Sequence, residues 1–357
     1  MKVQFQSIQT NDFADLLKRR IEQYFESAKI SKKANFEMVA KTIFYLSGLV
    51  GLYALIVSGL VGVWGALVCA IFLGLFTAGV GFNVSHDAIH GAYSHRPWVN
   101  ALLGQTFALM GASVFTWKTA HNVIHHSYTN IPEADGDLDA VRLLRFYKRK
   151  APDSLQRYQH WYAFGLYSLT SLVWVFFKDY AHVGRRKHLI YEKPKPPIYE
   201  YFILGGSKAA YYFTFLVLPM LITPFTWWQV LIGFLAMHLA CGFFLALTFQ
   251  LGHLVEGPEF PHLPSTGVMP DTRIVHQLKT TANFATEGFV SNWLFGGLNF
   301  QIEHHLFPKI CHVHYKRLAP IVRATAKEYG LPYHEYRTML SATLSHLRYL
   351  KEAGRTA

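Results

Sequence analysis

Three dense groups of histidines are the residues most able to do chemistry, and their spacing is typical of a metal centre. The groups are His121, His125 and His126; His86 and His90; and His304 and His305. On an α-helix, His121 and His125 would share a face, and His126 would point about a quarter-turn away. Imidazole binds iron, copper, zinc and nickel. One group could be a solvated, histidine-rich helix, but three groups favour a metal site.

The elements that must position these histidines are indicated by the composition, which favours an integral membrane protein. Of the 357 residues, 51% are hydrophobic and only 16% are charged. Residues 42–85 and 209–255 contain no Asp, Glu, Lys or Arg. Each run is about twice the ~20 residues that one helical crossing needs, so each predicts a hairpin of two transmembrane helices. A pair of buried core helices is the alternative, but such long uncharged runs are rare in soluble domains. The expected spans are 42–60, 64–85, 209–223 and 226–253.

The distribution of positive charge predicts the topology. All Lys and Arg residues lie outside the two uncharged runs, and the positive-inside rule places the segments that carry them in the cytoplasm. We therefore expect an all-α membrane protein with both termini inside. Its parts would be a cytoplasmic N-terminal arm (1–41) and a membrane domain (42–357). The cytoplasmic cap of that domain (86–208 and 254–357) would hold all three histidine groups on one side of the bilayer.

Several other classes of protein fit less well. The first 35 residues are polar and lack the apolar core of a signal peptide. The cysteines Cys69, Cys241 and Cys311 form no close pair, so neither disulfides nor thiolate metal sites are expected. The net charge of +12 accompanies no basic and aromatic binding module, so we expect no nucleic-acid partner. The acidic run at 135–139 lacks the spacing of an EF-hand, so we reject calcium.

His253, at the end of the expected fourth span, brings the candidate ligands to eight. A tetrahedral zinc site needs three or four protein ligands, so eight imidazoles suit two metal ions. Few carboxylates accompany them, and this balance suits two irons held mainly by histidine. Carboxylate-bridged di-iron bundles use Glu-x-x-His on helices. The only such spacing here, Glu259 to His262, is interrupted by Pro261.

Polar neighbours of these histidines are candidates for orienting the imidazoles. They are Asp87, Asn122 and Glu303, although a solvated polar residue explains each almost as well. His238 lies within the fourth span and is expected to be a hydrogen-bonded interior residue. His276 could have a supporting role near the site. The other histidines have no dense spacing, and a surface or interfacial position is expected for most of them: His95, His160, His182, His188, His262, His312, His314, His334 and His346.

The combined motifs resemble the membrane fatty acid desaturase family. They are HDAIHG at 86–91, HNVIHH at 121–126 after Trp117, and GGLNFQIEHHLFP at 296–308. Gln301 stands where many members have the first histidine of the third group. This feature is similar to the front-end and linoleoyl-CoA (delta-6-like) branch. The likeness extends from about residue 36 to the C-terminus.

This resemblance implies an oxygen-dependent di-iron enzyme that inserts a cis double bond into an acyl chain carried by coenzyme A or a lipid. It assigns the eight histidines as iron ligands, with Gln301 in place of a ninth. Gln301 could bind iron, bind through water, or only hydrogen-bond to a ligand. Gln250, three residues before His253, is a further helper in some branches. An apolar channel should lead to the metals, and Phe82, Trp117, Trp293 and Phe300 are candidates for its lining.

One departure concerns the electron supply. Fused members carry a cytochrome b5 domain with His-Pro-Gly-Gly, which is absent here. The electrons are therefore expected from a separate ferredoxin, rubredoxin or cytochrome b5 with its reductase. An acyl-chain hydroxylase on the same scaffold is the nearest alternative. A metal transporter is weaker, because it needs ionisable residues through the spans and His238 is almost the only one.

Overall fold

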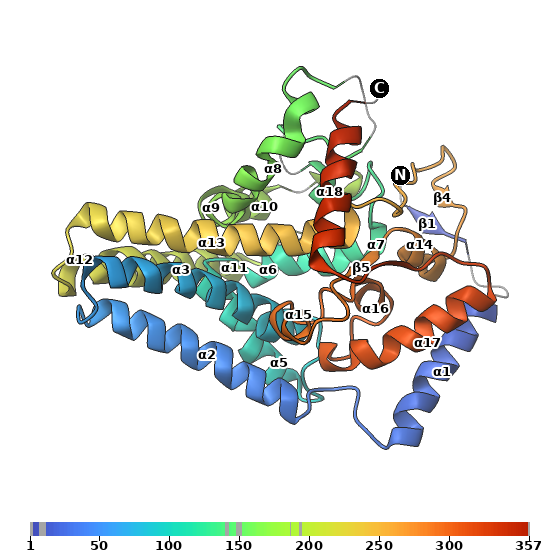
Figure 1. Cartoon of the computed structure of the whole chain (residues 1–357), viewed down its shortest axis with the longest axis horizontal. Helices are drawn as coiled ribbons and strands as arrows, with labels where there is room; N and C mark the ends of the chain where they lie inside the picture. The colour runs from blue at the N-terminus through green and yellow to red at the C-terminus, as the bar shows by residue number, and fades with distance from the viewer. Residues whose placement is uncertain are drawn as a thin grey trace.

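Long apolar helices run side by side at one end of the molecule, and short helices form a cap at the other (Figure 1). The computed structural model describes residues 3–6, 12–139, 143–147, 152–185, 187–192 and 195–355. Four helical stretches in this part of the chain are long and apolar enough to cross a membrane. The first is α2 (Phe36–Val57), and the second joins α3 (Gly62–Val80), η1 (Gly81–Ser85) and α4 (His86–Ile89). The third joins α11 (Ile198–Tyr212), η7 (Phe213–Val217) and α12 (Leu218–Ile222), and the fourth is α13 (Trp227–His253).

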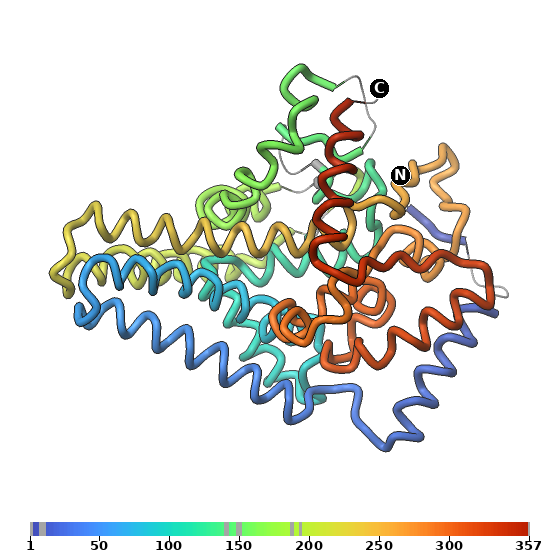
Figure 2. The backbone as a smooth tube through the Cα atoms, viewed as in Figure 1, coloured from blue at the N-terminus to red at the C-terminus, as the bar shows by residue number. Residues whose placement is uncertain are grey.

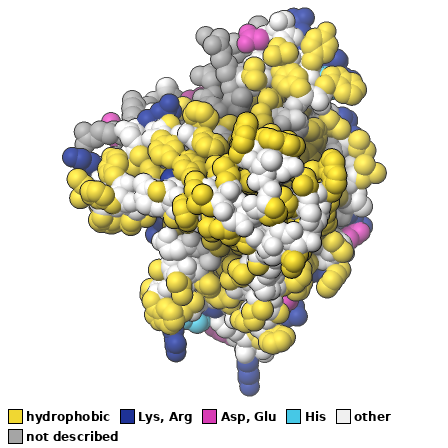
Figure 3. Space-filling view, turned by 90° about the vertical axis from the view of Figure 1, so that its left-hand side faces the viewer, with side chains coloured by type: hydrophobic (Ala, Val, Ile, Leu, Met, Phe, Trp, Pro, Cys, Tyr) yellow, Lys and Arg dark blue, Asp and Glu magenta, His cyan; other side chains and the backbone are white. Residues whose placement is uncertain are grey.

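The two hairpin turns lie next to each other, at the end away from the cap. A Cβ atom added to Gly59 would be 3.0 Å from Pro224, which lies in the other turn. Hydrophobic side chains cover this end of the molecule, and charged side chains lie near the margins of the same view (Figure 3). His86 and His253 both lie at the cap ends of their spans, away from the hairpin turns, as expected. The second and fourth of the long apolar stretches therefore bring their histidines to the same end of the molecule.

The third span begins at Ile198, eleven residues before the expected 209. The difference arises from Lys208, which is 2% exposed and pairs with Asp179 at 2.8 Å. Asp179 begins α10 (Asp179–Gly184). A buried, paired lysine can lie within an apolar helix. A boundary predicted from the absence of charged residues, however, must fall directly after that lysine. The first span likewise begins at Phe36 rather than 42.

A sharply bent helical segment follows the second span. Its first arm, α5 (Pro97–Gly104) with η2 (Gln105–Met110), meets its second arm at 107°. Gly111 lies at the bend with φ +69°, a left-handed conformation that favours glycine. The second arm carries the histidines at 121–126 and consists of α6 (Val114–Lys118), η3 (Thr119–His125) and α7 (His126–Tyr128). In the sequence, the apolar stretch 98–117 is too short to span comfortably and predicts a re-entrant or interfacial helix, with which the bend accords.

The rest of the described cap consists of short helices and three pairs of strands. The strand pairs are β1 (Gln4–Phe5) with β4 (Val268–Met269), parallel; β2 (Lys187–His188) with β3 (Tyr191–Glu192), antiparallel; and β5 (Ala282–Phe284) with β6 (His334–Tyr336), parallel. The helices before the third span are η4 (Gly136–Asp139), η5 (Gln156–Tyr158), α8 (Gln159–Ser168), α9 (Thr170–Val173) and η6 (Trp174–Lys178). Those after the fourth are α14 (Arg273–Lys279), α15 (Phe289–Leu294), α16 (Gln301–Leu306), η8 (His312–His314), α17 (Tyr315–Glu328) and α18 (Met339–Ala353).

The start of the last helix corrects a sequence interpretation. The sequence pattern predicts a final helix over about 334–351, but His334–Tyr336 pairs with β5, and α18 begins only after its cap residue Thr338. Tertiary pairing overrides the local preference there. The pattern also predicts a helix over about 315–329 that stops at Gly330, which α17 confirms, and Gly330 has φ +64°.

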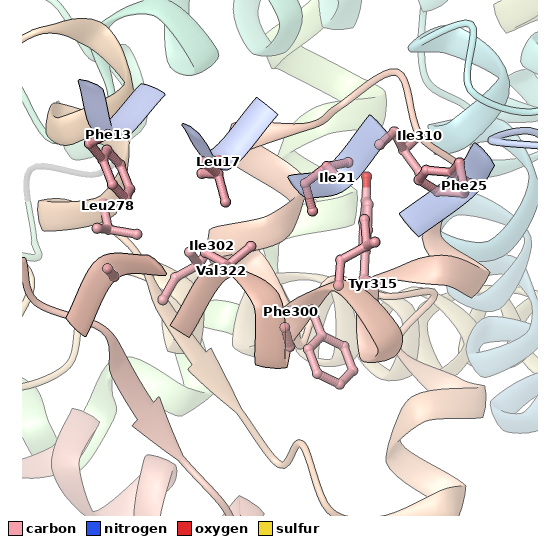
Figure 4. Packing of buried hydrophobic residues seen from close by; sticks show 13 residues of the cluster. Phe13, Leu17, Ile21, Phe25, Leu278, Phe300, Ile302, Ile310, Tyr315 and Val322 are labelled. Carbon is pink, nitrogen blue, oxygen red and sulfur yellow. The ribbon is translucent and has the colours of Figure 1, made fainter. Parts of the chain in front are cut away.

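The N-terminal helix α1 (Asp12–Ala28) packs against the C-terminal part of the chain (Figure 2). The amphipathic pattern of residues 13–25 is compatible with a helix on the membrane surface or with an ordinary solvated helix. The apolar residues of α1 are instead buried against α16, α17 and neighbouring loops. Figure 4 shows these side chains of α1 facing the cluster: Phe13, Leu17, Ile21 and Phe25. The apolar face of α1 is therefore covered by protein and supports the segment that carries the third histidine group.

Candidate metal centre

All eight candidate histidines meet in one cluster. They come from the ends of the second and fourth spans, from the second arm of the bent segment and from α16. All except His90 are at least 94% buried. Ring centroids lie 4.5 Å apart between His86 and His304, and 4.3 Å apart between His126 and His305. Segments far apart in the sequence thus place imidazoles in direct contact.

The cluster divides into two groups that could each hold a metal ion. In each group, one nitrogen from every histidine lies within 4.8 Å of the others. The first group is His86, His90, His121 and His304. The second is His125, His253 and His305. His126 lies between them: it forms a further such set with His304 and His305, and its Nε2 is 3.2 Å from His121 Nε2.

A π-helix shapes the middle histidine group and differs from the α-helix expected there. The π-helical stretch η3 ends at His125, and His126 follows directly. A π-helix pairs residues five apart, so His121 and His126 lie next to each other, with ring centroids 4.7 Å apart and ring planes perpendicular. The His121 and His125 rings are stacked at 17°, with centroids 5.4 Å apart. A second π-helix, η1, directly precedes His86. The widened turns help to direct the first two groups of imidazoles into one space.

Hydrogen bonds from outside the cluster orient the second group. His125 donates from Nδ1 to Asp135 Oδ2 at 3.0 Å, and His305 donates from Nδ1 to Gln277 Oε1 at 2.7 Å. His253 Nδ1 lies 3.3 Å from the carbonyl oxygen of Thr280. Donation from Nδ1 leaves the lone pair on Nε2, so all three rings can present Nε2 to the same space. Histidine ligands of metals are commonly fixed in this way.

Several buried nitrogens of the first group and of His126 have no hydrogen-bond partner among the described residues. Buried polar atoms are nearly always hydrogen-bonded, so a cluster of unpaired imidazole nitrogens fits metal ligands well. The unpaired atoms that could bind a metal ion are His90 Nε2, His126 Nδ1 and His304 Nε2. The residues therefore fit a group of two metal ions on the chemistry of their donor set.

Gln301 lies within the second group. Its Nε2 is 2.9 Å from His253 Nε2, and its buried Oε1 has no hydrogen-bond partner. A half-turn of the amide exchanges these two atoms, and would direct a carbonyl oxygen toward the three Nε2 atoms. The position of Gln301 accords with the three options open from the sequence and adds an oxygen donor at the correct place.

The electrostatics favour the neutral form of several imidazoles of the cluster, whereas Asp135 raises the pKa of His125 above its usual value. Burial lowers the pKa of His304 and His305 well below 6.5, and the neighbouring imidazoles lower it further. The pKa of His90 is lowered by burial and by His86. Neutral imidazole is the form that binds a metal ion. At neutral pH these side chains are therefore ready to act as ligands without losing a proton.

The expected supporting residues have different positions in the structure. Asp87 Oδ1 lies 3.7 Å from His86 Nδ1, next to a candidate ligand as expected. Asn122 donates to the carbonyl oxygen of Ile89. Glu303 is buried with Asn283 and Tyr333, and burial raises its pKa to about 7. Asn122 and Glu303 therefore stabilise the backbone and packing around the cluster, without a recorded hydrogen bond to its imidazoles.

Sequence reasoning missed several of the residues that surround the cluster. Asp135 belongs to an acidic run that was not assigned to any histidine, and Gln277 follows His276 in a stretch that was considered only for a supporting role. His312, His314 and His346 were expected near the surface, but each is at least 96% buried. Their signal could not be found in spacing, because their partners are distant in sequence. His238 is confirmed as a hydrogen-bonded interior residue, with Ser171 and Tyr211 as partners.

An open pocket lies beside the second group. His121, His125 and His253 form one wall, and Gln250 and Trp117 are also in its lining. Its apolar walls include Phe146, Leu166, Trp174, Ala246 and Phe249. Phe82, Trp293 and Phe300 are not part of it and pack in or against the protein interior. A mainly apolar pocket beside a metal-binding cluster can admit a hydrocarbon chain.

Comparison with known proteins identifies the family. A family model described as fatty acid desaturase matches residues 61–337. The chain belongs to the fatty acid desaturase family. An sn-1 linoleoyl-lipid 6-desaturase of Arthrospira platensis is 34% identical over 95% of this chain and 92% of its own length. Another from a Synechocystis species is 33% identical over 98% of this chain and 97% of its own. An acyl-lipid (8-3)-desaturase of Physcomitrium patens is 33% identical over 99% of this chain and 74% of its own.

The protein is therefore an oxidoreductase of lipid metabolism that desaturates fatty acyl chains. Its four apolar helical stretches accord with a membrane desaturase. The histidine cluster is consistent with the histidine boxes of the family.

Proposed function

We propose that the protein binds two iron ions in its histidine cluster and uses them to insert a double bond into an acyl chain of a membrane lipid. The observation that carries the proposal is the meeting of eight imidazoles in two overlapping groups. His86, His90, His121 and His304 would hold one ion, and His125, His253 and His305 the other. His126 lies between the two. Gln301 would complete the second group through its carbonyl oxygen.

When bound, a pair of irons supplies the activation of dioxygen that removal of hydrogen from an unactivated methylene requires. The protein holds the imidazoles in place through the hydrogen bonds of Asp135, Gln277 and Thr280. The pocket beside His121, His125 and His253 would fix the acyl chain against the site and exclude water. Such positioning matters because a methylene has no polar group to hold.

The substrate class follows from the named relatives. Two of them share the name sn-1 linoleoyl-lipid 6-desaturase, and the third is named acyl-lipid (8-3)-desaturase, so all three are named for lipid-bound acyl chains. We assign an acyl-lipid substrate here. A separate electron-carrier protein would reduce the irons, with ferredoxin, rubredoxin and cytochrome b5 as the candidate classes. The charge distribution supports a cytoplasmic position for both termini and the metal centre.

Expression in a host of known lipid composition tests this proposal. Mass spectrometry of intact lipids and of their fatty acids should reveal a product that lacks two hydrogens, still esterified to lipid, and fragmentation gives the position of the bond. A product that has gained one oxygen atom would instead indicate a hydroxylase. His125→Ala should abolish the product. His238→Gln, which changes a buried histidine outside the cluster, is the control. A new fatty acid formed equally by His125→Ala and the parent chain would contradict the proposed ligand set.

A further inference from the structure

A second buried polar network lies directly behind His86. It contains Asp87, His312 from η8 and Lys41 from the first span. Asp87 Oδ2 accepts from both the backbone N–H and the ring Nδ1 of His312, at 3.0 and 2.9 Å. Lys41 Nζ lies 2.8 Å from His312 Nε2. The three side chains are 2%, 4% and 1% exposed, respectively. Spans one and two and the segment after the third histidine group therefore meet in one continuous chain of contacts.

The donors and acceptors of this network have only one consistent arrangement. An ammonium group can only donate, so Lys41 donates to Nε2 of His312. Nδ1 of His312 then carries the proton and donates to Asp87. Burial lowers the pKa of His312, and the neighbouring Lys41 lowers it further, which accords with a neutral ring. Each group in the network thus determines the orientation of the next.

The network ends at a candidate iron ligand. Asp87 Oδ1, the oxygen not used by His312, lies 3.7 Å from His86 Nδ1. His86 Nε2 faces the cluster, 3.3 Å from His121 Nε2. A carboxylate behind Nδ1 favours the tautomer with its proton on Nδ1 and the lone pair on Nε2. The orientation of His86 therefore depends on a carboxylate that His312 holds in place.

A third metal site is the competing explanation, because Asp87, Cys311 and His312 also lie within ligand distance of one another. The contacts argue against it. The Lys41 ammonium already occupies Nε2 of His312, and Asp87 occupies Nδ1. Burial raises the pKa of the Cys311 thiol well above 9, so it stays protonated and is a poor ligand. The cation of this network is the lysine.

The burial of Lys41 is energetically unfavourable unless its charge is compensated. Lys41 lies in the first span and is only 1% exposed, so its ammonium group loses its hydration and needs a compensating partner. Its recorded contacts are His312 and the face of the Trp293 ring, whose centroid is 5.5 Å from Nζ. Neither contact carries a negative charge. The compensating anion is Asp87, reached through the imidazole.

We propose that Lys41 and His312 are positioning residues that act through Asp87 to hold His86 in its metal-binding orientation. The inference rests on the proposed iron centre and adds a function for residues outside the histidine boxes. It also explains why a buried lysine and a buried histidine lie 271 positions apart in sequence and in contact in space.

Iron retention of the purified full-length chain tests this inference. Lys41→Met removes the ammonium and keeps the length of the side chain. His312→Gln is the second variant if Lys41→Met does not accumulate. Asp87→Asn and the double variant Lys41→Met/Asp87→Asn complete a cycle. His238→Gln is the matched control, because it also removes a buried imidazole with both nitrogens engaged. Each protein is dialysed against a chelator, and its iron content and unfolding midpoint are measured.

We expect Lys41→Met and His312→Gln to retain iron about 10–100-fold less tightly, with the loss concentrated in one of the two ions. Lys41→Met should add little in the Asp87→Asn background, because all of its effect passes through Asp87. His238→Gln should keep its iron. Unchanged iron retention in Lys41→Met or His312→Gln, or full additivity in the cycle, would overturn the inference and leave the iron centre intact. An iron-free parent chain would overturn the proposed function and this inference together.

Discussion

At the scale of single residues, the metal centre depends on which nitrogen of each imidazole faces inward. Three of the rings are oriented by residues that lie outside the histidine motifs but next to them in space. Asp135 orients His125, Thr280 orients His253, and Gln277 orients His305. A ligand set can be recognised from its spacing, because one segment holds several ligands. The residues that orient the rings cannot, since each is joined to its histidine only by the fold.

Asp135→Asn tests this orientation. The asparagine keeps the shape but loses the charge of the acceptor for His125 Nδ1–H. We expect iron affinity to fall about 10–100-fold, measured as iron per chain in chelator competition. Asp15→Asn, on the exposed side of α1, is the control for loss of a carboxylate. Equal affinities for Asp135→Asn and the parent chain would show that the carboxylate does not support the ligand.

At the scale of elements, the sequence is sufficient for the spans and insufficient for the local helix type. The two uncharged runs predict two hairpins, and four apolar helical stretches confirm them. The start of the third span was predicted too late because Lys208 ends the uncharged run. Its burial could not be foreseen, since its partner, Asp179, lies in another element. The π-helix before His126 could not be predicted from the sequence either, since its wider turn depends on packing and not on residue preference. The eight candidate histidines do meet in one cluster, and their role as metal ligands stays a prediction.

Glycine substitutions test how tightly the third histidine group is held against the second span. Gly296 has φ +56°, and a Cβ there would lie 2.5 Å from the carbonyl oxygen of Phe82. Gly330 has φ +64°, with nothing within 4 Å of such a Cβ. We expect Gly330→Ala to cost about 1–2 kcal/mol from backbone strain alone. Gly296→Ala should cost roughly 2–5 kcal/mol, because the clash adds to the strain. Chemical denaturation in detergent measures both, and equal losses would contradict the close contact.

The packing of α1 makes a separate prediction. Leu17 is 1% exposed in the cluster shared with α16 and α17 (Figure 4). Leu17→Ala should therefore lower the free energy of unfolding by about 2–5 kcal/mol. Lys18→Ala, on the exposed side of the same helix, should change it by less than about 0.5 kcal/mol. If the two variants are equally stable in denaturation, α1 does not pack on the cap.

At the scale of the whole molecule, membrane spans and cap share one buried polar interior. Two histidines outside the cluster join different segments of the molecule. His276 donates to the carbonyl oxygen of Thr129, and His346 donates to that of Leu254. Burial lowers the pKa of each of these two side chains from 6.5 to about 4. They are neutral in the folded protein at a pH where the unfolded chain takes up protons.

Stability should therefore depend on pH in a defined direction. Between about pH 6.5 and 4, the unfolded chain binds more protons at these two sites than the folded chain. The free energy of unfolding should thus fall as the pH falls through this window, by about 2 kcal/mol for each histidine at pH 5. Denaturation at a series of pH values measures this slope. His346→Gln should make the slope shallower, and an unchanged slope in that variant would exclude a contribution from His346.

The central claim is that eight imidazoles from four parts of the chain bind two iron ions at one place. The most direct measurement is the iron content per chain of the purified, active protein, compared with that of His304→Ala. The account predicts about two irons per parent chain, and a loss of iron together with the loss of desaturated product in the variant. A parent chain that makes the product without iron, or a His304→Ala variant that keeps both ions, would contradict it.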